Sequence, residues 1–214
     1  MIFYNPISGE VFTYKVVFNP RTCFVMTQLG EPIPKVVKHI STILDEVLRK
    51  YSLERIDATS FVTGRDFMQK VWELLITVPL GIAIIDEDMS SSTLCNIFYE
   101  IGIMHALGKE TLIIKTKNTK VPSDFVRTEY IDFNNEFRKN LKKYFEITYK
   151  KRSDFYETVA DSLSENPLLA IDYLRRAYLL SGDEKLRKEA KKIHEDLDRT
   201  HRAKNSVENL LIDF

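Results

Sequence analysis

Long apolar runs and an excess of charge of one sign are both missing from this chain. No stretch reaches about 18 uninterrupted apolar residues, the length that a membrane-spanning helix needs, and the first residues lack the basic and apolar regions of a signal peptide. Lysine plus arginine number 31, as do aspartate plus glutamate, so the formal net charge at pH 7 is zero. We therefore expect a soluble protein with no membrane partner, and nucleic acid is not an expected partner either.

Cysteine and glycine are also scarce. Cys23 and Cys95 are the only cysteines and lie far apart in the sequence, which suits a reducing compartment and predicts the cytoplasm. The seven glycines form neither GxGxxG nor GxxxxGK[ST], which argues against a dinucleotide fingerprint and a P-loop. The four histidines lack HExxH or Cys/His spacing, so we predict no metal site and no required cofactor.

Short apolar strands alternate with amphipathic helices between about residues 21 and 134. The bare apolar run GIAII is typical of a strand that is buried on both faces of a parallel sheet. This alternation predicts βαβ units with right-handed crossovers, and hence an α/β protein with a Rossmann-like parallel sheet flanked by helices. The expected strands are 22–26, 55–58, 81–85, 111–115 and 130–133, and the expected helices are 36–51, 65–76 and 96–107.

The segments on either side of this region have other patterns. Residues 1–20 contain two β-rich runs around a turn, which predicts an N-terminal β-hairpin. Residues 135–214 are helical in pattern, with a helix that begins at Pro167 after Asn166, ends at Gly182 and is followed by another helix after Asp183. This pair resembles one tetratricopeptide-type hairpin, and we interpret it as an appendage for packing, oligomerisation or a protein partner. The predicted parts are therefore 1–20, 21–134 and 135–214.

Three loops are candidates for a ligand site, because ligands bind beyond the carboxyl ends of the strands in an open parallel sheet. They span residues 27–32, 59–66 and 86–96, each follows a predicted strand, and we expect them to converge on one crevice. The candidate substrate-binding residues in these loops and at the start of the next helix are Thr27, Gln28, Gly30, Gly64, Arg65, Asp88, Ser90, Ser91, Ser92, Asn96 and Tyr99.

Glu100 and Asp86 are the candidate catalytic residues. We expect Glu100 in the first turns of a helix that Asn96 caps, facing protein or crevice; partial burial would raise its pKa, whereas the helix N-terminus and nearby serines would lower it. Gly102 and Ala106 form a stripe that would let this helix approach the sheet closely. Asp86, at the exit of a strand, could bind a ribose hydroxyl or act as a second acid/base group. The structural alternative is that Glu100 only interacts with the helix dipole and Asp86 only forms a turn.

The segment GIAIIDEDMSSSTLCNIFYEIGIMHALGKETLII, residues 81–114, resembles the core signature of two related families. These are the nucleoside 2-deoxyribosyltransferase-like proteins and the bacterial TIR-like nucleotide-binding proteins, which share a flavodoxin-like or TIR-like α/β fold. In both, an apolar strand ending in aspartate precedes a loop rich in serine or asparagine, a Tyr-Glu-Leu/Ile-Gly helix start and an Ala-Leu-Gly-Lys helix end. The matching positions are Tyr99 to Gly102 and His105 to Lys109, and the TGRDFMQKVWELL segment with Gly64, Arg65, Asp66 and Trp72 is similar to the TIR-like branch.

The resemblance implies N-glycosidic bond chemistry on a nucleoside, nucleotide or NAD-type substrate, by hydrolysis or base transfer. Glu100 would attack or stabilise C1′ of the sugar, Asp86 would contact the sugar or assist proton transfer, and the serines with Asn96 would bind sugar hydroxyls or a 5′-phosphate. The loop DEDMSSST departs from the Asn-Pro-Asn loop of the TIR-like branch, which leaves the substrate open. The resemblance also leads us to expect a homo-oligomer, with Phe3, Tyr4 and Phe12 as candidate contacts.

Two further interpretations stay open. The chain could be a non-catalytic nucleotide sensor that signals through its helical tail, or a structural module whose tail recruits a partner. The sensor would bind nucleotides without turnover and would keep that binding when Glu100 becomes glutamine.

Overall fold

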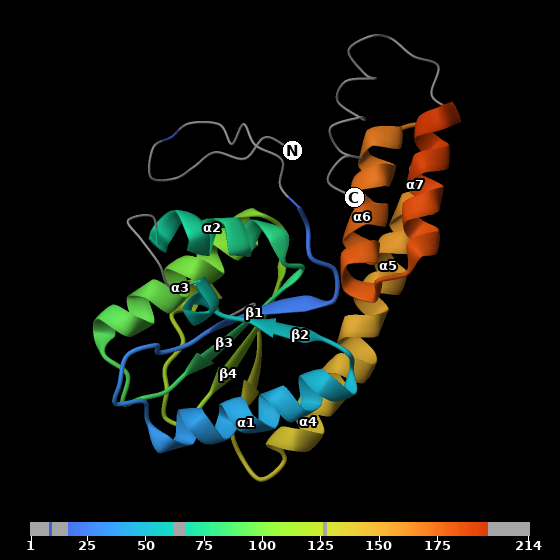
Figure 1. The fold of residues 1–214 in the computed structure, drawn as a ribbon. Helices are drawn as coiled ribbons and strands as arrows, with labels where there is room; N and C mark the ends of the chain where they lie inside the picture. Colours follow the sequence, from blue (N-terminus) through green and yellow to red (C-terminus); the bar gives the residue numbers. More distant parts are fainter. Residues whose placement is uncertain (1–8, 10–16, 62–66, 126–127, 197–214) are drawn as a thin grey trace. The chain divides into compact units, whose positions relative to one another are not determined.

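The computed structural model describes residue 9 and residues 17–61, 67–125 and 128–196 (Figure 1). Contacts divide the chain into two compact units, one formed by residues 22–146 and the other by residues 1–21 together with 147–214. The predicted N-terminal hairpin, including Phe3, Tyr4 and Phe12, falls on residues outside the described part.

The first unit contains a five-stranded, all-parallel sheet in the order β2-β1-β3-β4-β5. Val25 in β1 pairs with Ile82 in β3, which pairs in turn with Leu112 in β4, so the most apolar strands lie at the centre. This confirms the predicted α/β, Rossmann-like fold, because strands buried on both faces need helices on both faces. The strands are β1 (Thr22–Met26), β2 (Glu54–Ile56), β3 (Leu80–Ile85), β4 (Glu110–Lys115) and β5 (Glu129–Asp132).

Helices cover both faces of the sheet (Figure 1). On one face lie α1 (Lys35–Lys50) and α4 (Phe137–Lys143), and on the other lie α2 (Phe67–Thr77) and α3 (Ser91–Ala106). Short 3-10 turns follow β2, as η1 (Ala58–Phe61), and precede β5, as η2 (Ser123–Phe125). The helix faces that meet the sheet are apolar; in α1, for example, six aliphatic side chains at helical spacing are buried.

Helix α3 packs closely on β3 at a glycine of the strand, not at a glycine of the helix. A Cβ atom on Gly81 would overlap Sδ of Met104, whereas a Cβ atom on Gly102 would meet nothing within 4 Å. Ala106 is exposed. The predicted small-residue stripe of Gly102 and Ala106 is therefore wrong, because Ile101 and Met104, on a different side of the helix, face the sheet.

The end of α3 agrees with the sequence pattern. Gly108 has φ of 65°, its N–H donates to the carbonyl of His105, and the N–H of Lys109 donates to the carbonyl of Met104. These two bonds form a Schellman motif, in which glycine supplies the left-handed residue. The Lys109 ammonium also donates to the carbonyl of Ile76, 2.8 Å away in the last turn of α2. Gly108 and Lys109 thus stabilise the ends of α3 and α2, which is a structural role.

The second unit contains α5 (Lys150–Asp161), α6 (Pro167–Ser181) and α7 (Glu184–Asp196), with α6 packed against both of the others. Asn166 caps α6 through its side chain, Gly182 ends that helix with φ of 73°, and the Asp183 side chain accepts the N–H of Lys185. These caps confirm the predicted start and end of α6 and the predicted start of α7. The boundary between the two units falls inside η3 (Tyr144–Tyr149), a π-helix that the hydrophobic pattern did not indicate.

A buried ionic cluster stabilises α6. Arg175 is 6% exposed, its Nη2 lies 2.6 Å from Oδ1 of Asp172, and its guanidinium lies 4.9 Å from the ring centre of Phe18. Arg176 holds the other carboxylate oxygen of Asp172 at 2.9 Å. The two cations hold the pKa of Asp172 below its usual value although burial alone would raise it.

Candidate active site

The strand order places a crevice between β1 and β3. The chain leaves β1 toward β2 at one edge of the sheet and leaves β3 toward β4 in the opposite direction. The loops that follow these two neighbouring strands therefore diverge, and open α/β sheets bind ligands at this point, beyond the carboxyl ends of the strands.

A cavity of about 360 Å³ lies at this position. One wall comes from the loop after β1, and the other comes from α3, which follows β3. The lining residues are Thr27, Gln28, Leu29, Gly30, Glu31, Thr93, Asn96, Ile97, Tyr99 and Glu100. Six of the residues predicted from the sequence are among them, namely Thr27, Gln28, Gly30, Asn96, Tyr99 and Glu100.

The wall after β1 is held by hydrogen bonds within its own loop. The Nε2 of Gln28 donates to the carbonyls of Gly30 and Pro32, both at 2.9 Å. The Glu31 carboxylate accepts the N–H of Ile33 at 2.9 Å and the ammonium of Lys38 at 3.2 Å. These donors lower the pKa of Glu31, the Ile33 N–H most strongly. The Gln28 amide nitrogen is thus engaged inside the loop, where it shapes the wall.

Helix α3 begins earlier than the sequence predicts. Ser90 is the N-cap, and its hydroxyl oxygen accepts the N–H of Thr93 at 3.1 Å, so the first helical residue is Ser91. The predicted cap at Asn96 is therefore wrong, because the run of serines and threonine before it forms a helical turn. As a result, Glu100 is the tenth residue of the 16-residue helix. The helix dipole acts within the first turn and does not favour a charge at that depth.

The Glu100 carboxyl group has an unusual environment. Its side chain is partly buried against the cavity, and among the described residues it has no hydrogen-bond or ion-pair partner. Desolvation raises the pKa of Glu100 to about 7, and no charge in the described part of the chain offsets that effect. Near neutral pH the group is thus poised between its acid and its carboxylate, the range in which catalytic carboxyl groups operate.

Polar and apolar side chains surround Glu100 in the cavity. The Oγ1 of Thr27 is buried and has no hydrogen-bond partner in the described part of the chain, so it is available to a ligand. Asn96 and Tyr99 are exposed on the helix side, and Leu29 on the loop side is 40% exposed. Convergent polar groups beside apolar surface are the usual composition of a small-molecule site.

Asp86 does not line the cavity. It is 2% exposed, its Oδ1 accepts the N–H of Asp88 at 3.1 Å, and its carbonyl accepts the N–H of Met89. This Asx-type turn is the arrangement that the structural alternative describes. Asp88 and the serines Ser90, Ser91 and Ser92 also lie outside the lining, while Gly64 and Arg65 lie outside the described residues.

Sequence reasoning missed four lining residues: Leu29, Glu31, Thr93 and Ile97. Leu29 and Glu31 belong to the predicted ligand loop at residues 27–32, but no rule distinguished them from their neighbours. Thr93 and Ile97 lie seven and three residues before Glu100, which places them on its side of the helix. The position of the true N-cap, Ser90, would have brought them into consideration.

His105 and Cys95 are separate from this site. The His105 ring nitrogen Nε2 lies 2.6 Å from Oγ1 of Thr111, the ring contacts Phe125, and burial lowers its pKa. This agrees with a packing role. Cys95 is exposed, so it is not the small buried residue that a lone cysteine usually is, and it does not line the cavity.

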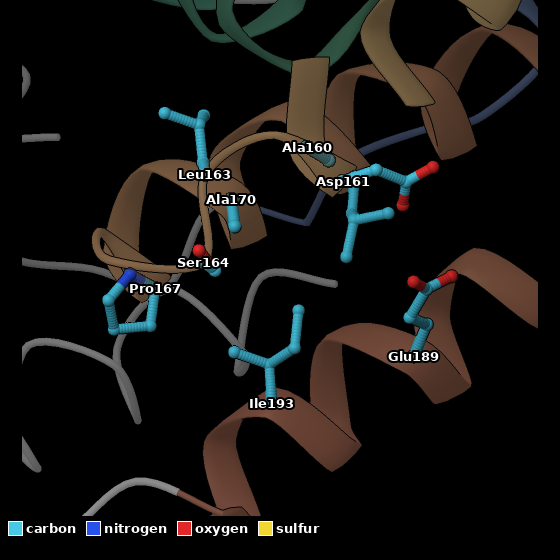
Figure 2. A pocket seen from close by; sticks show the side chains of 9 residues that line it. Ala160, Asp161, Leu163, Ser164, Pro167, Ala170, Glu189 and Ile193 are labelled. Carbon is cyan, nitrogen blue, oxygen red and sulfur yellow. The ribbon is translucent and has the colours of Figure 1, made fainter. Parts of the chain in front are cut away.

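A second cavity, of about 240 Å³, lies in the helical unit (Figure 2). Leu163, Pro167, Ala170 and Ile193 give it an apolar lining, and Asp161 and Glu189 on different helices flank it. It contains no residue that the sequence analysis selected. Its chemistry is that of a packing gap between helices with two carboxylates beside it, so it is not the candidate active site.

The described residues show neither a membrane-spanning helix nor a cluster of metal ligands. None of the helices there combines the length and hydrophobicity of a membrane-spanning segment. No group of three or more His, Cys, Asp or Glu side chains in that part of the chain is arranged to hold a metal ion.

Comparisons with known proteins add structural similarity at low sequence identity. No family model matches the chain, and a search of characterised proteins found no sequence match. A solved structure of the 2-deoxyribosyltransferase from the psychrotolerant bacterium Bacillus psychrosaccharolyticus is similar, with 13% sequence identity and a TM-score of 0.43, over 57% of this chain and 91% of that one. The fold assignment rests on the strand order and register of this chain.

Proposed function

We propose that the protein cleaves the N-glycosidic bond of a nucleoside-type substrate, or transfers its base, with Glu100 as the catalytic carboxylate. The observation that carries this proposal is a partly buried carboxyl group that has no partner among the described residues, in a cavity at the switch point of the sheet. The resemblance of residues 81–114 to the deoxyribosyltransferase-like signature supports it independently.

The reaction gives a reason for a carboxylate at this place. As the base departs, positive charge develops at C1′ of the sugar, and a carboxylate on the opposite side stabilises that charge or forms a covalent intermediate. Desolvation strengthens this interaction because the low-dielectric cavity screens it less than water does. The carboxylate form is required, so activity should rise with pH through about 7, the pKa of Glu100.

The other lining residues have matching roles in this proposal. The unpartnered hydroxyl of Thr27 and the side chains of Asn96 and Tyr99 bind sugar hydroxyls, whereas Leu29 and Ile97 provide apolar surface for the base. Asp86 shapes the loop after β3 through its turn, without touching the substrate.

Chromatography of free bases tests the proposal. The protein is incubated with deoxynucleosides, ribonucleosides, nucleoside monophosphates and NAD, each with and without a second free base as acceptor. We expect base release that is lost in Glu100→Gln and retained in Glu54→Gln, whose exposed side chain lies at the start of β2, the amino end of the sheet. An exchanged base would indicate transfer, and a free sugar would indicate hydrolysis.

If none of these compounds releases a base, the enzymatic proposal is refuted. If nucleotides then still bind, and bind equally to Glu100→Gln, the non-catalytic sensor becomes the better description. Calorimetric titration with the same compounds measures that binding.

A further inference from the structure

The described residues that line the cavity carry charges of one sign. Of these ten residues, Glu31 and Glu100 carry the charges, and lysine, arginine and histidine do not occur among them. Lys38 in α1 forms an ion pair with the Glu31 carboxylate, and Lys38 does not line the cavity. Glu100 has no counter-charge in the described part of the chain.

We propose that the cavity takes N-glycosides whose base is positively charged, such as pyridinium or N7-alkylated purine nucleosides, in preference to neutral nucleosides and phosphate-bearing nucleotides. This inference rests on the proposed function, since it specifies the substrate class of the same site. A cation beside Glu100 supplies the counter-charge that the described residues do not provide, and a phosphate would face two carboxylates.

The leaving group supplies a second argument. A neutral base normally needs a proton from a general acid before it departs. The two carboxyl groups among the described lining residues are the candidates for that acid, and neither supplies the proton. Glu100 cannot do so while it acts as the carboxylate at C1′. Glu31 is held in its ionised form by the Ile33 N–H and Lys38. The remaining described side chains of the lining include hydroxyls and carboxamides that can hydrogen-bond to a ligand, but no further carboxyl, imidazole or ammonium group.

A cationic base departs without that proton. The C1′–N bond breaks, both of its electrons pass to the positively charged ring nitrogen, and the base leaves as a neutral molecule. The positive charge moves to C1′, where the Glu100 carboxylate stabilises it or forms an ester. Water then adds its oxygen to C1′ and releases one proton, so a cationic nucleoside and water give a free sugar, a neutral base and a proton.

Matched substrates test this preference. Guanosine and 7-methylguanosine differ by a methyl group and a positive charge, and nicotinamide riboside and its 5′-phosphate differ by the phosphate. After subtraction of the uncatalysed rates, we expect kcat/KM to be at least tenfold higher for 7-methylguanosine than for guanosine, and higher for the riboside than for its phosphate. Equal values for guanosine and 7-methylguanosine would overturn the inference while leaving the proposed function intact, as would a preference for the phosphate.

Binding of a pair that cannot be cleaved separates the two proposals. N1-methylnicotinamide is a pyridinium cation without a sugar, and nicotinamide is its neutral counterpart. We expect the cation to bind more tightly by calorimetric titration, and this preference to fall by about two- to fivefold in Glu31→Gln, the effect of one exposed charge. Lys38→Met is the matched control, because it removes the ion pair of the loop and keeps the carboxylate, so the preference should persist or increase.

The control also distinguishes charge from loop shape. If Lys38→Met lost the preference as Glu31→Gln did, the loop conformation would be responsible and the inference would be wrong. Equal binding of both nicotinamides to the unmodified protein would also overturn it. If no nucleoside released a base but the cation still bound preferentially, the proposed reaction would fail and the charge selectivity of the cavity would stand.

Discussion

The replacement of Glu100 by glutamine should change how the stability of the protein depends on pH. Glutamine has nearly the same size and shape as glutamic acid but cannot ionise, so the variant keeps the side-chain packing and loses the titration. In the folded protein desolvation raises the pKa of this carboxyl group to about 7, against 4.5 for an unperturbed glutamate. The folded state therefore holds its proton more tightly than the unfolded chain does.

The direction and size of the change in unfolding free energy follow from this difference in pKa. Between pH 4.5 and about 7 the native state binds more protons at Glu100 than the unfolded state, so the free energy of unfolding decreases as the pH rises through that window. Each pH unit corresponds to about 1.4 kcal/mol, which gives at most about 3 kcal/mol over the window. Water in the open cavity reduces the value. Glu100→Gln should thus match the unmodified protein near pH 4 and exceed its stability by up to about 3 kcal/mol at pH 8.

Urea denaturation at half-unit steps from pH 4 to pH 8.5 measures this difference. Glu31→Gln is the control of opposite sign, since the pKa of Glu31 is lowered in the folded state. Its carboxylate stabilises the protein above the unfolded pKa, so the variant should be less stable at neutral pH and should approach the unmodified protein as the pH falls. Parallel curves for the unmodified protein and Glu100→Gln over the whole range would refute the desolvation of Glu100.

Three further predictions concern the elements that hold the site. Gly81→Val should cost about 2 kcal/mol of unfolding free energy, because its side chain would overlap Met104 under α3; urea unfolding measures it. Ser90→Ala should cost about 1 kcal/mol by removing the N-cap of α3, whereas Ser92→Ala, a control in the same turn, should cost less in the same assay. Arg175→Met should destabilise the protein by about 2 kcal/mol, because it leaves a buried carboxylate with one cation instead of two; thermal and urea unfolding should agree on the loss.

Most of the sheet could be predicted from the sequence, because strands buried on both faces have a simple signature. The strand Thr22–Met26 has the predicted bounds, and the strand predicted at GIAII is longer by one residue, Leu80, at its start. Helix ends that depend on one residue, such as Gly108 and Gly182, were also predictable, since glycine supplies the left-handed conformation. The π-helix was not, because its backbone pattern has no distinct spacing of apolar residues.

The site was harder to predict than the fold, and Asn96 shows why. Several residues before Glu100 can cap a helix, and the choice among them depends on which hydroxyl reaches a free N–H in three dimensions. The structure selects Ser90, and this moves Glu100 from the first turn to the third. Asp86 was predicted correctly at the end of β3, but its role was not. The turn that engages its carboxylate depends on the backbone after the strand, which the sequence pattern does not reveal.

The position of the cap bears directly on the structural alternative for Glu100. A carboxylate that served only the helix dipole would lie in the first turn, at residues 91–93, where the free N–H groups are. Glu100 lies two turns further on, where the dipole gives it little and desolvation costs it up to about 3 kcal/mol when ionised. That is a large share of the roughly 5–15 kcal/mol that stabilises an ordinary domain. A leucine or glutamine at the same place would avoid the cost without altering the helix. A charged side chain that opposes folding, has no partner in the part of the chain that the structure describes and borders a cavity is explained by a ligand that bears or develops positive charge beside it.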